Sequence, residues 1–449
     1  MKHVKMCGAG LVVKKVTNIM PPITVPYIKE KWAHAGFQKY FRNIGWAFSG
    51  RMFSLLVSFF IGALVARYLG PERYGVLNYA LSFVTLFVFL SSFGIDNILV
   101  REILKYKEKT EPILNTAFII KLMGAFVIII VATSSSLLLK NDTYTTILIF
   151  IYSFHLVFTA LNVTDIYFQS TVKYKYNFLA QFISTIAVSM LKLYFVYAGF
   201  GTGWFILALV FETAVSSFVF LEIFYRSGRS LDFTFDSKVA KKMLLDAWPF
   251  ILTTAFYLIY TKIDQVMIGK MIDTKALGIY SAGVKLAELW YFIPALICGV
   301  MFPAVINAKL ADKTLYEQRL KKIFIFVTST SFIIAFFQLV FAKQIILFLF
   351  GEAYMDSVVI LEIYTWAGVI VSVIIVLQQY LIIENKTKLV MYASLFGASA
   401  NIILNLAFIP KFGIIGSAWA TLISYSTIPL IIFYLINKNT KFIKTRTAL

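Results

Sequence analysis

Long apolar runs recur along nearly the whole chain, and they constrain its fold more than any other feature. Each run is long enough to cross the roughly 30 Å hydrocarbon core of a bilayer as an α-helix. The runs are continuous, without the alternation of barrel strands, and lipid offers the backbone no partners, so helices are favoured. The chain is 60% hydrophobic and only 14% charged, which excludes an ordinary soluble domain. We therefore predict an all-α polytopic membrane protein.

The predicted crossings number about twelve, and several are long enough to tilt in the bilayer or to run past it. They span residues 45–68, 74–100, 113–139, 143–168, 177–198, 203–225, 246–270, 276–306, 322–350, 356–383, 388–409 and 413–436.

Lys and Arg residues outside these crossings are distributed very unevenly. Four lie in the loops on one side, whereas thirty lie on the side that both termini share. The thirty fall in residues 1–44, 101–112, 169–176, 226–245, 307–322, 384–388 and 437–449. By the positive-inside rule, both termini lie in the cytoplasm and the protein is a multi-pass protein of the cytoplasmic membrane. Most of the net charge of +20 then serves to orient the chain in the membrane. It also suits anionic membrane lipids as partners and gives no reason to expect nucleic acid.

The chain divides at its midpoint, where the charged segment 226–245 separates two sets of six crossings. We interpret it as a cytoplasmic linker between an N-lobe, 45–225, and a C-lobe, 246–436. A shift of 203 residues places Gly75 on Gly278 and Arg67 on Lys270. Internal repeats of this kind are typical of transporters, whose two lobes flank a central cleft. A basic segment, 1–44, precedes the lobes, and a cytoplasmic tail, 437–449, follows them.

Several stretches in both lobes resemble one family. They are FFIGALVARYLGPERYGVLNYA in the first hairpin, YTKIDQVMIGKMIDTKALGIYSAGVKL and LFLFGEAYMDSVVILEIY in the second lobe, and NIILNLAFIPKFGIIGSAWATLIS near the end. Through them the chain resembles the polysaccharide flippase family of Wzx-type repeat-unit transporters, in the superfamily of MATE exporters and lipid II flippases. The resemblance covers roughly residues 40–440.

The resemblance implies a MATE-like fold and an alternating-access carrier. Its cargo would be an isoprenoid-diphosphate-linked oligosaccharide, of the undecaprenyl or dolichyl type, for surface polysaccharide or glycan biosynthesis. It also suggests membrane proteins of polymer assembly as partners. The motifs specify the fold well and the substrate poorly. A cation-coupled drug or metabolite antiporter of the same fold is the alternative.

Charged residues deep in the apolar runs are the candidates for function, because each costs roughly 2.5–3.5 kcal/mol at a helix centre. A diphosphate headgroup needs a cationic path through the bilayer. Lys262 and Lys285, with Arg51 nearer the entrance, are therefore predicted to contact phosphate.

Buried carboxylates and amides complete the predicted site. Asp264, Glu288 and Glu212 are candidates for coupling to H⁺ or Na⁺, since burial favours proton uptake by a carboxylate. The alternative is that the deep charges pair internally as ion pairs between helices. Asn401 and Asn405, four residues apart, are candidates for binding sugar hydroxyls, although such residues more often join helices.

No enzyme signature accompanies these residues. The chain lacks a phosphate-binding GxxxxGK[ST] loop, HExxH, GxSxG and paired-cysteine metal spacing. The predicted loops opposite the termini are too short for a catalytic domain such as a membrane polymerase or ligase would carry. We therefore expect a carrier that is not an enzyme, without metal or cofactor.

Overall fold

The computed structural model describes residues 35–92, 94–384 and 386–446, and its regular structure there is entirely helical. Residues 1–34 of the predicted N-terminal segment and 447–449 of the predicted tail lie outside the described residues. The helices are α2 (Ala35–Thr85), α3 (Phe89–Ser92), α4 (Ile95–Lys105), α5 (Thr110–Leu138), α6 (Thr143–Ser153), α7 (His155–Ala160), α8 (Val163–Ser170), α9 (Tyr174–Tyr197), α10 (Thr202–Arg226), α11 (Ser237–Met271), α12 (Thr274–Glu288), α13 (Phe292–Ala311), α14 (Lys313–Val340), α15 (Ala342–Leu349), α16 (Ser357–Ile383) and α17 (Thr387–Arg446), with 3₁₀ turns at Lys107–Lys109 and Glu352–Tyr354.

Twelve membrane crossings result, because two of the ten long apolar helical segments in the described residues turn back on themselves. Helix α2 reverses at Gly70, with φ of 71°, and α17 reverses at Gly413, with φ of 60°. Glycine adopts this left-handed region without steric cost, and Pro71 then starts the next helix with a fixed φ. The predicted all-α polytopic fold is confirmed: Gly70 lies in the predicted loop 69–73, and Gly413 is the first residue of the crossing predicted over 413–436.

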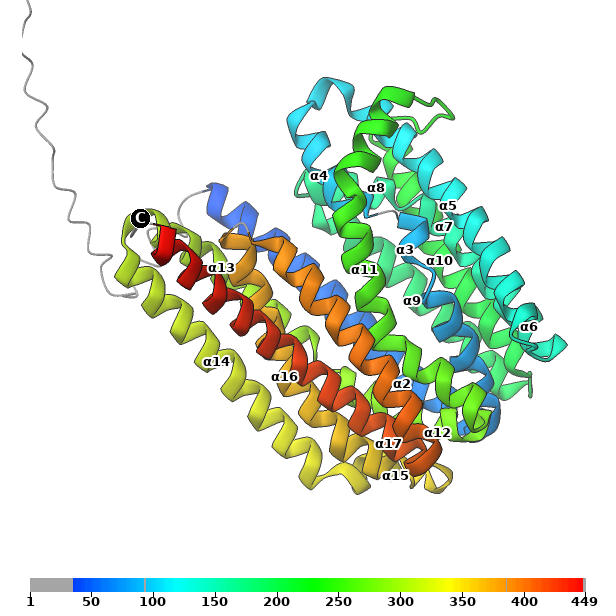
Figure 1. The fold of residues 1–449 in the computed structure, drawn as a ribbon. Coiled ribbons are helices and arrows are strands. Elements are labelled where there is room, and N and C mark those ends of the chain that lie inside the picture. Colours follow the sequence, from blue (N-terminus) through cyan, green and yellow to red (C-terminus); the bar gives the residue numbers. More distant parts are fainter. Residues whose placement is uncertain (1–34, 93, 385, 447–449) are drawn as a thin grey trace, which may run out of the picture.

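The helices form two groups (Figure 1). Helices α3 to α10 lie in one group and α13 to α17 in the other, and the groups meet near α12 and diverge toward α4 and α13. We call the end near α4 and α13 the basic end, because the loops at 106–109, 227–236 and 384–386 lie there. We call the opposite end, with the reversals at Gly70 and Gly413, the hairpin end.

Helix α11 starts inside the segment predicted to be a linker. The Asp236 side chain accepts hydrogen bonds from the backbone N–H groups of Lys238 and Val239, which caps the helix at Ser237. Its first turns bury Met243 and Ala247 in the N-lobe core, in the same apolar cluster as Leu99. The helix then continues into the C-lobe, so one element belongs to both groups.

The hairpin end is closed by direct backbone packing between the two lobes. A Cβ on Gly75 would lie 1.6 Å from the Thr274 carbonyl oxygen, and a Cβ on Gly278 would lie 1.8 Å from that of Pro71. The 203-residue shift that relates Gly75 to Gly278 also relates Pro71 to Thr274. The two contacts are thus equivalent in the repeat, and only glycine permits either of them.

Side-chain hydrogen bonds reinforce this closure. The Tyr354 hydroxyl donates to the Ala66 carbonyl oxygen at 2.6 Å, and the Ser82 hydroxyl donates to Gln265 Oε1 at 2.5 Å. Both bonds join the N-lobe to the C-lobe, and all four residues are buried. They satisfy polar groups that would otherwise lie unpaired inside the bundle.

Four predicted crossings are not continuous helices: 276–306 is interrupted between α12 and α13, 322–350 between α14 and α15, and two more lie in the N-lobe. The crossing predicted over 74–100 is interrupted between α2 and α4, with Gly94 at a φ of 64°. The crossing predicted over 143–168 is divided into α6, α7 and α8. Non-helical backbone at membrane depth is tolerated only where protein or a polar cavity surrounds it. These interruptions were not predicted from the sequence.

Candidate functional site

A cavity of about 1500 Å³ lies between the two lobes. Phe48 and Tyr174 line it toward the basic end, and Tyr74, next to the close contact at Gly75, lines it toward the hairpin end. The cavity is therefore closed at the hairpin end, and its walls come from both lobes.

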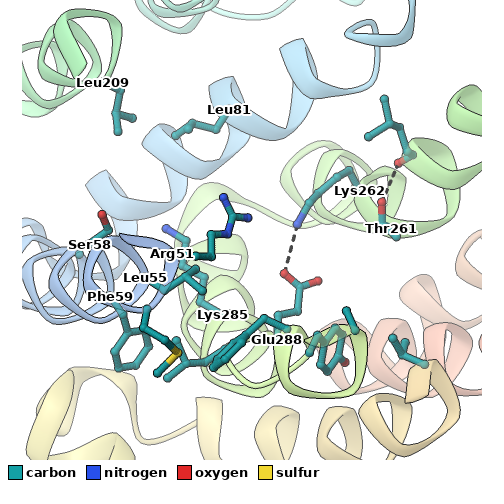
Figure 2. Close-up of a pocket in the computed structure, with 18 of the residues that line it drawn as sticks. Arg51, Leu55, Ser58, Phe59, Leu81, Leu209, Thr261, Lys262, Lys285 and Glu288 are labelled. Carbon is teal, nitrogen blue, oxygen red and sulfur yellow. Dashed lines mark hydrogen bonds and ion pairs between the residues drawn. The ribbon is translucent and has the colours of Figure 1, made fainter. Parts of the chain in front are cut away.

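Five of the eight predicted site residues line this cavity. They are Arg51 of α2, Glu212 of α10, Lys262 of α11, and Lys285 and Glu288 of α12. Figure 2 shows the side chains of Arg51 and Lys285 reaching into the same space as Lys262 and Glu288. The tertiary fold thus brings together charges that lie far apart in the sequence.

Two ion pairs account for part of this charge. Lys262 Nζ lies 3.4 Å from Glu288 Oε2, and Lys192 Nζ lies 3.0 Å from Glu212 Oε2. Internal pairing, the alternative weighed from the sequence, therefore applies to these four groups. Lys192, on α9, also lines the cavity. Its position near the end of a predicted crossing gave no sign of this, because hydropathy shows depth and not which way a helix face points.

Arg51 and Lys285 have no carboxylate partner among the described residues. Lys285 Nζ instead lies 4.9 Å from the centroid of the Tyr74 ring, a cation–π contact that leaves its charge uncompensated. Arg51 is exposed within the open bundle. With four cations and two carboxylates on its walls, the cavity carries a formal charge of +2.

Aromatic and apolar side chains form most of the remaining wall. Tyr257, Tyr260, Tyr291 and Tyr425 all line the cavity. Rings with one polar edge suit the faces of sugars or of other ring-bearing ligands. Tyr280 is fully buried outside the cavity.

The other three predicted site residues lie outside the cavity. Asp264 is fully buried, and its carboxylate accepts hydrogen bonds from Tyr280 Oη at 2.6 Å and Thr421 Oγ1 at 3.3 Å. Asn401 and Asn405 are also fully buried. The expectation that these amides line the cleft is corrected here, since both face the second half of α17.

The amides instead join the two halves of α17. Asn401 Nδ2 donates to Ser424 Oγ at 3.0 Å, and Asn405 Oδ1 accepts from Ser417 Oγ at 2.7 Å. Thr421 connects this network to Asp264. The result is a buried cluster, rich in oxygen atoms, at the junction of α11, α12 and α17.

No metal centre is evident in the described part of the chain. In residues 35–92, 94–384 and 386–446, no group of three or more His, Cys, Asp and Glu side chains is placed to hold a metal ion.

The fold and the charged cavity between two lobes define a polytopic membrane carrier. A model of the polysaccharide biosynthesis protein family matches residues 40–309, and a MatE model matches residues 249–407. The chain belongs to the polysaccharide biosynthesis protein family, and the resemblance seen in the sequence is confirmed.

A curated relative agrees with this assignment. The chain is 27% identical over 259 residues to "Probable flippase AglR" of Haloferax volcanii, covering 53% of this chain and 50% of that protein. It thus spans about half the length of that relative.

Among solved structures, "Lipid II flippase MurJ, inward closed conformation" has a TM-score of 0.68 at 18% identity, covering 87% of both chains. An inward-facing multidrug resistance MATE transporter has a TM-score of 0.70 at 15% identity, covering 87% of this chain and 96% of the other. Both likenesses concern the fold alone.

Proposed function

We propose that this protein is a flippase that moves an isoprenoid-diphosphate-linked oligosaccharide across the cytoplasmic membrane by alternating access. The observation that carries the proposal is the net positive cavity with two cations that have no carboxylate partner. A diphosphate taken bare through hydrocarbon would face a prohibitive desolvation cost. Arg51 and Lys285 can replace its hydration with charge-assisted hydrogen bonds.

The size of the cavity supports a large polar headgroup. Sites for drug-sized ligands commonly measure about 300–1,000 Å³, whereas this cavity measures about 1500 Å³. The tyrosines on its wall offer surfaces for sugar rings. The isoprenoid chain need not enter, because it can stay in the lipid while the headgroup crosses between the lobes.

The charge distribution of the loops sets the direction in this proposal. If the basic end faces the cytoplasm, as the positive-inside rule indicates, the present state is closed toward the outside and receives cargo from the cytoplasmic leaflet. Opening of the contacts at Gly75 and Gly278 would then release the cargo outward.

The buried cluster around Asp264 is the best candidate for ion coupling. Glu212 and Glu288 already pair with lysines, whereas Asp264 has only hydroxyl and backbone donors at hydrogen-bond distance. Oxygen atoms of Asn401, Asn405 and the α17 hydroxyls lie in the same cluster. A cation, H⁺ or Na⁺, bound there would bias how α11 packs against α17.

The test compares transport with and without the unpaired cations. In cells lacking the gene, lipid-linked oligosaccharide should accumulate on the cytoplasmic leaflet and surface polymer should disappear. The wild-type gene should restore both. Lys285→Ala and Arg51→Ala should restore neither, whereas Lys343→Ala, an exposed lysine outside the cavity, should behave as wild type. Full restoration by both cavity variants would contradict the cationic-path mechanism.

An antiporter for drugs or metabolites is the second candidate, and the MatE match over residues 249–407 favours it. In that case deletion should leave glycolipid and surface polymer unchanged and alter sensitivity to cationic compounds. The net positive charge of the cavity disfavours such cations as cargo.

A further inference from the structure

Another pocket, of about 380 Å³, lies in the N-lobe away from the central cavity, and it opens to the surface, since the Asp96 side chain on its wall is 50% exposed. Two interrupted crossings form it: α3 and α4 meet at Gly94, and α7 and α8 meet at residues 161–162. Its polar lining residues are Ser91, Asp96, Lys121, His155, Thr159, Asn162, Asp165 and Gln169. Interrupted helices around a polar pocket are a recurrent way of building ion sites in membrane proteins.

One carboxylate in this pocket has no cationic partner. Lys121, whose side chain is 6% exposed, places its Nζ 2.8 Å from Asp96 Oδ1, and this pair is neutral overall. Asp165 accepts hydrogen bonds only from the amides of Gln169, at 3.0 Å, and Asn177. No Lys or Arg lies within ion-pair distance of it in the described residues. An ionised Asp165 therefore has no ion pair of its own, although Lys121 lines the same pocket.

Asn177 is the second hydrogen-bonding partner of this carboxyl group. It is 7% exposed, and its Nδ2 donates to Asp165, while its Oδ1 has no hydrogen-bond partner. A protonated Asp165 would offer an O–H donor to this amide, which can accept it through Oδ1 after rotation. The amide can therefore contact the carboxyl group in either protonation state.

The surrounding groups favour a proton over a metal cation. Facing Asp165 are Asp96 on α4, Lys121 on α5 and His155 on α7, while α9 contributes the uncharged Asn177. Two amide N–H groups point at the carboxylate and a lysine ammonium lies in the same pocket. A sodium ion would need those positions to be filled by oxygen atoms.

His155 also lines this pocket. Its Nδ1 lies 2.6 Å from the Tyr152 carbonyl oxygen, to which it must donate, leaving Nε2 able to accept a proton. The two rings stack with centroids 4.3 Å apart. His155 and Tyr152 thus form a stacked, hydrogen-bonded pair beside the pocket.

We propose that Asp165 is a proton-binding site in the N-lobe, formed with Asn177 and Gln169. Its protonation removes a charge that has no ion pair of its own. A role in driving transport rests on the proposed function, whereas proton binding itself does not.

The test measures protonation directly and needs no substrate. Full-length protein in lipid nanodiscs is titrated between about pH 5 and about pH 8, the range in which perturbed carboxyl groups commonly titrate. The infrared stretch of the protonated carboxyl group is recorded at each pH in sodium-free buffer. We expect a titrating band in the wild type that is lost in Asp165→Asn and shifted in frequency in Asp165→Glu.

Two matched variants locate the signal. Asp96→Asn removes the paired carboxylate of the same pocket, and Asp264→Asn removes the candidate coupling site of the C-lobe. Both should keep the Asp165 band. An unchanged difference spectrum in Asp165→Asn would overturn the proposal, as would a band that responds to added sodium at fixed pH. If the wild-type protein shows the band but does not transport lipid-linked oligosaccharide, that result would count only against the proposed function.

Discussion

The paired glycine contacts at the hairpin end allow the closed state to be strained selectively. In Gly278→Ala, the new Cβ would lie 1.8 Å from the Pro71 carbonyl oxygen, where ordinary contacts begin near 3.4 Å. The two backbones must therefore separate by about 1.5 Å. Overpacking of this kind typically costs 1–3 kcal/mol. Because the lobes touch there only when this end is closed, the cost falls on the closed state alone.

This cost converts directly into a change of populations. Since 1.4 kcal/mol is a factor of ten, the ratio of closed to open hairpin ends should fall by about 5-fold to 150-fold. Gly75→Ala should act in the same direction, because its Cβ would lie 1.6 Å from the Thr274 carbonyl oxygen. Gly299→Ala is the matched control, since a Cβ on that helical glycine meets nothing within 4 Å.

Distances between spin labels across the hairpin end report these populations. Labels attached after Tyr197→Cys in the N-lobe and Lys343→Cys in the C-lobe sit on exposed residues at that end. The labelled background carries Cys7→Ser and Cys298→Ser. Gly278→Ala should add a population at longer distance that Gly299→Ala lacks. Identical distance distributions in the two variants would refute the idea that glycine packing holds this end closed.

Two further predictions concern stability. Glu102 is 7% exposed, and although its burial alone would raise its pKa, hydrogen bonds from Lys242 and Arg101 outweigh this and lower the pKa. The contribution of Glu102 to the free energy of unfolding, about 1 kcal/mol, is therefore present above about pH 4.5 and is lost as the pH falls through the lowered pKa. The melting temperature of Glu102→Gln should therefore approach that of the wild type in acid. A difference in melting temperature that does not depend on pH would count against the pairing. Asn405→Leu should lower stability by about 1–3 kcal/mol, because Ser417 loses its buried acceptor; an unchanged melting temperature in detergent would show that the network contributes nothing.

Depth in the membrane could be predicted from the sequence, but the direction in which a side chain faces could not. Arg51, Lys262 and Lys285 stand out because charges are rare in apolar runs, and all three line the cavity. Asn401 and Asn405 are equally conspicuous, yet they face another helix. Hydropathy is averaged around the helix axis, so it carries no information on which face meets the cleft.

The internal repeat, like the fold, could be recognised from the sequence. Gly75 and Gly278 could be paired by a simple shift because both hairpins require the same close approach. The interruption between α7 and α8 left no comparable trace, since residues 161–162 contain neither Gly nor Pro. The sequence therefore gave no sign that Asp165 lines a pocket within the N-lobe.

The two equivalent contacts at the hairpin end also restrict how the lobes can move against each other. Neither contact leaves room for a Cβ, so a sliding motion that brought either pair of backbones closer would create a clash. A rotation that tips the lobes apart separates both at once. The packing at these four backbone positions thus favours a rocking rotation of the lobes for opening and closing the hairpin end, before any cargo or ion is bound.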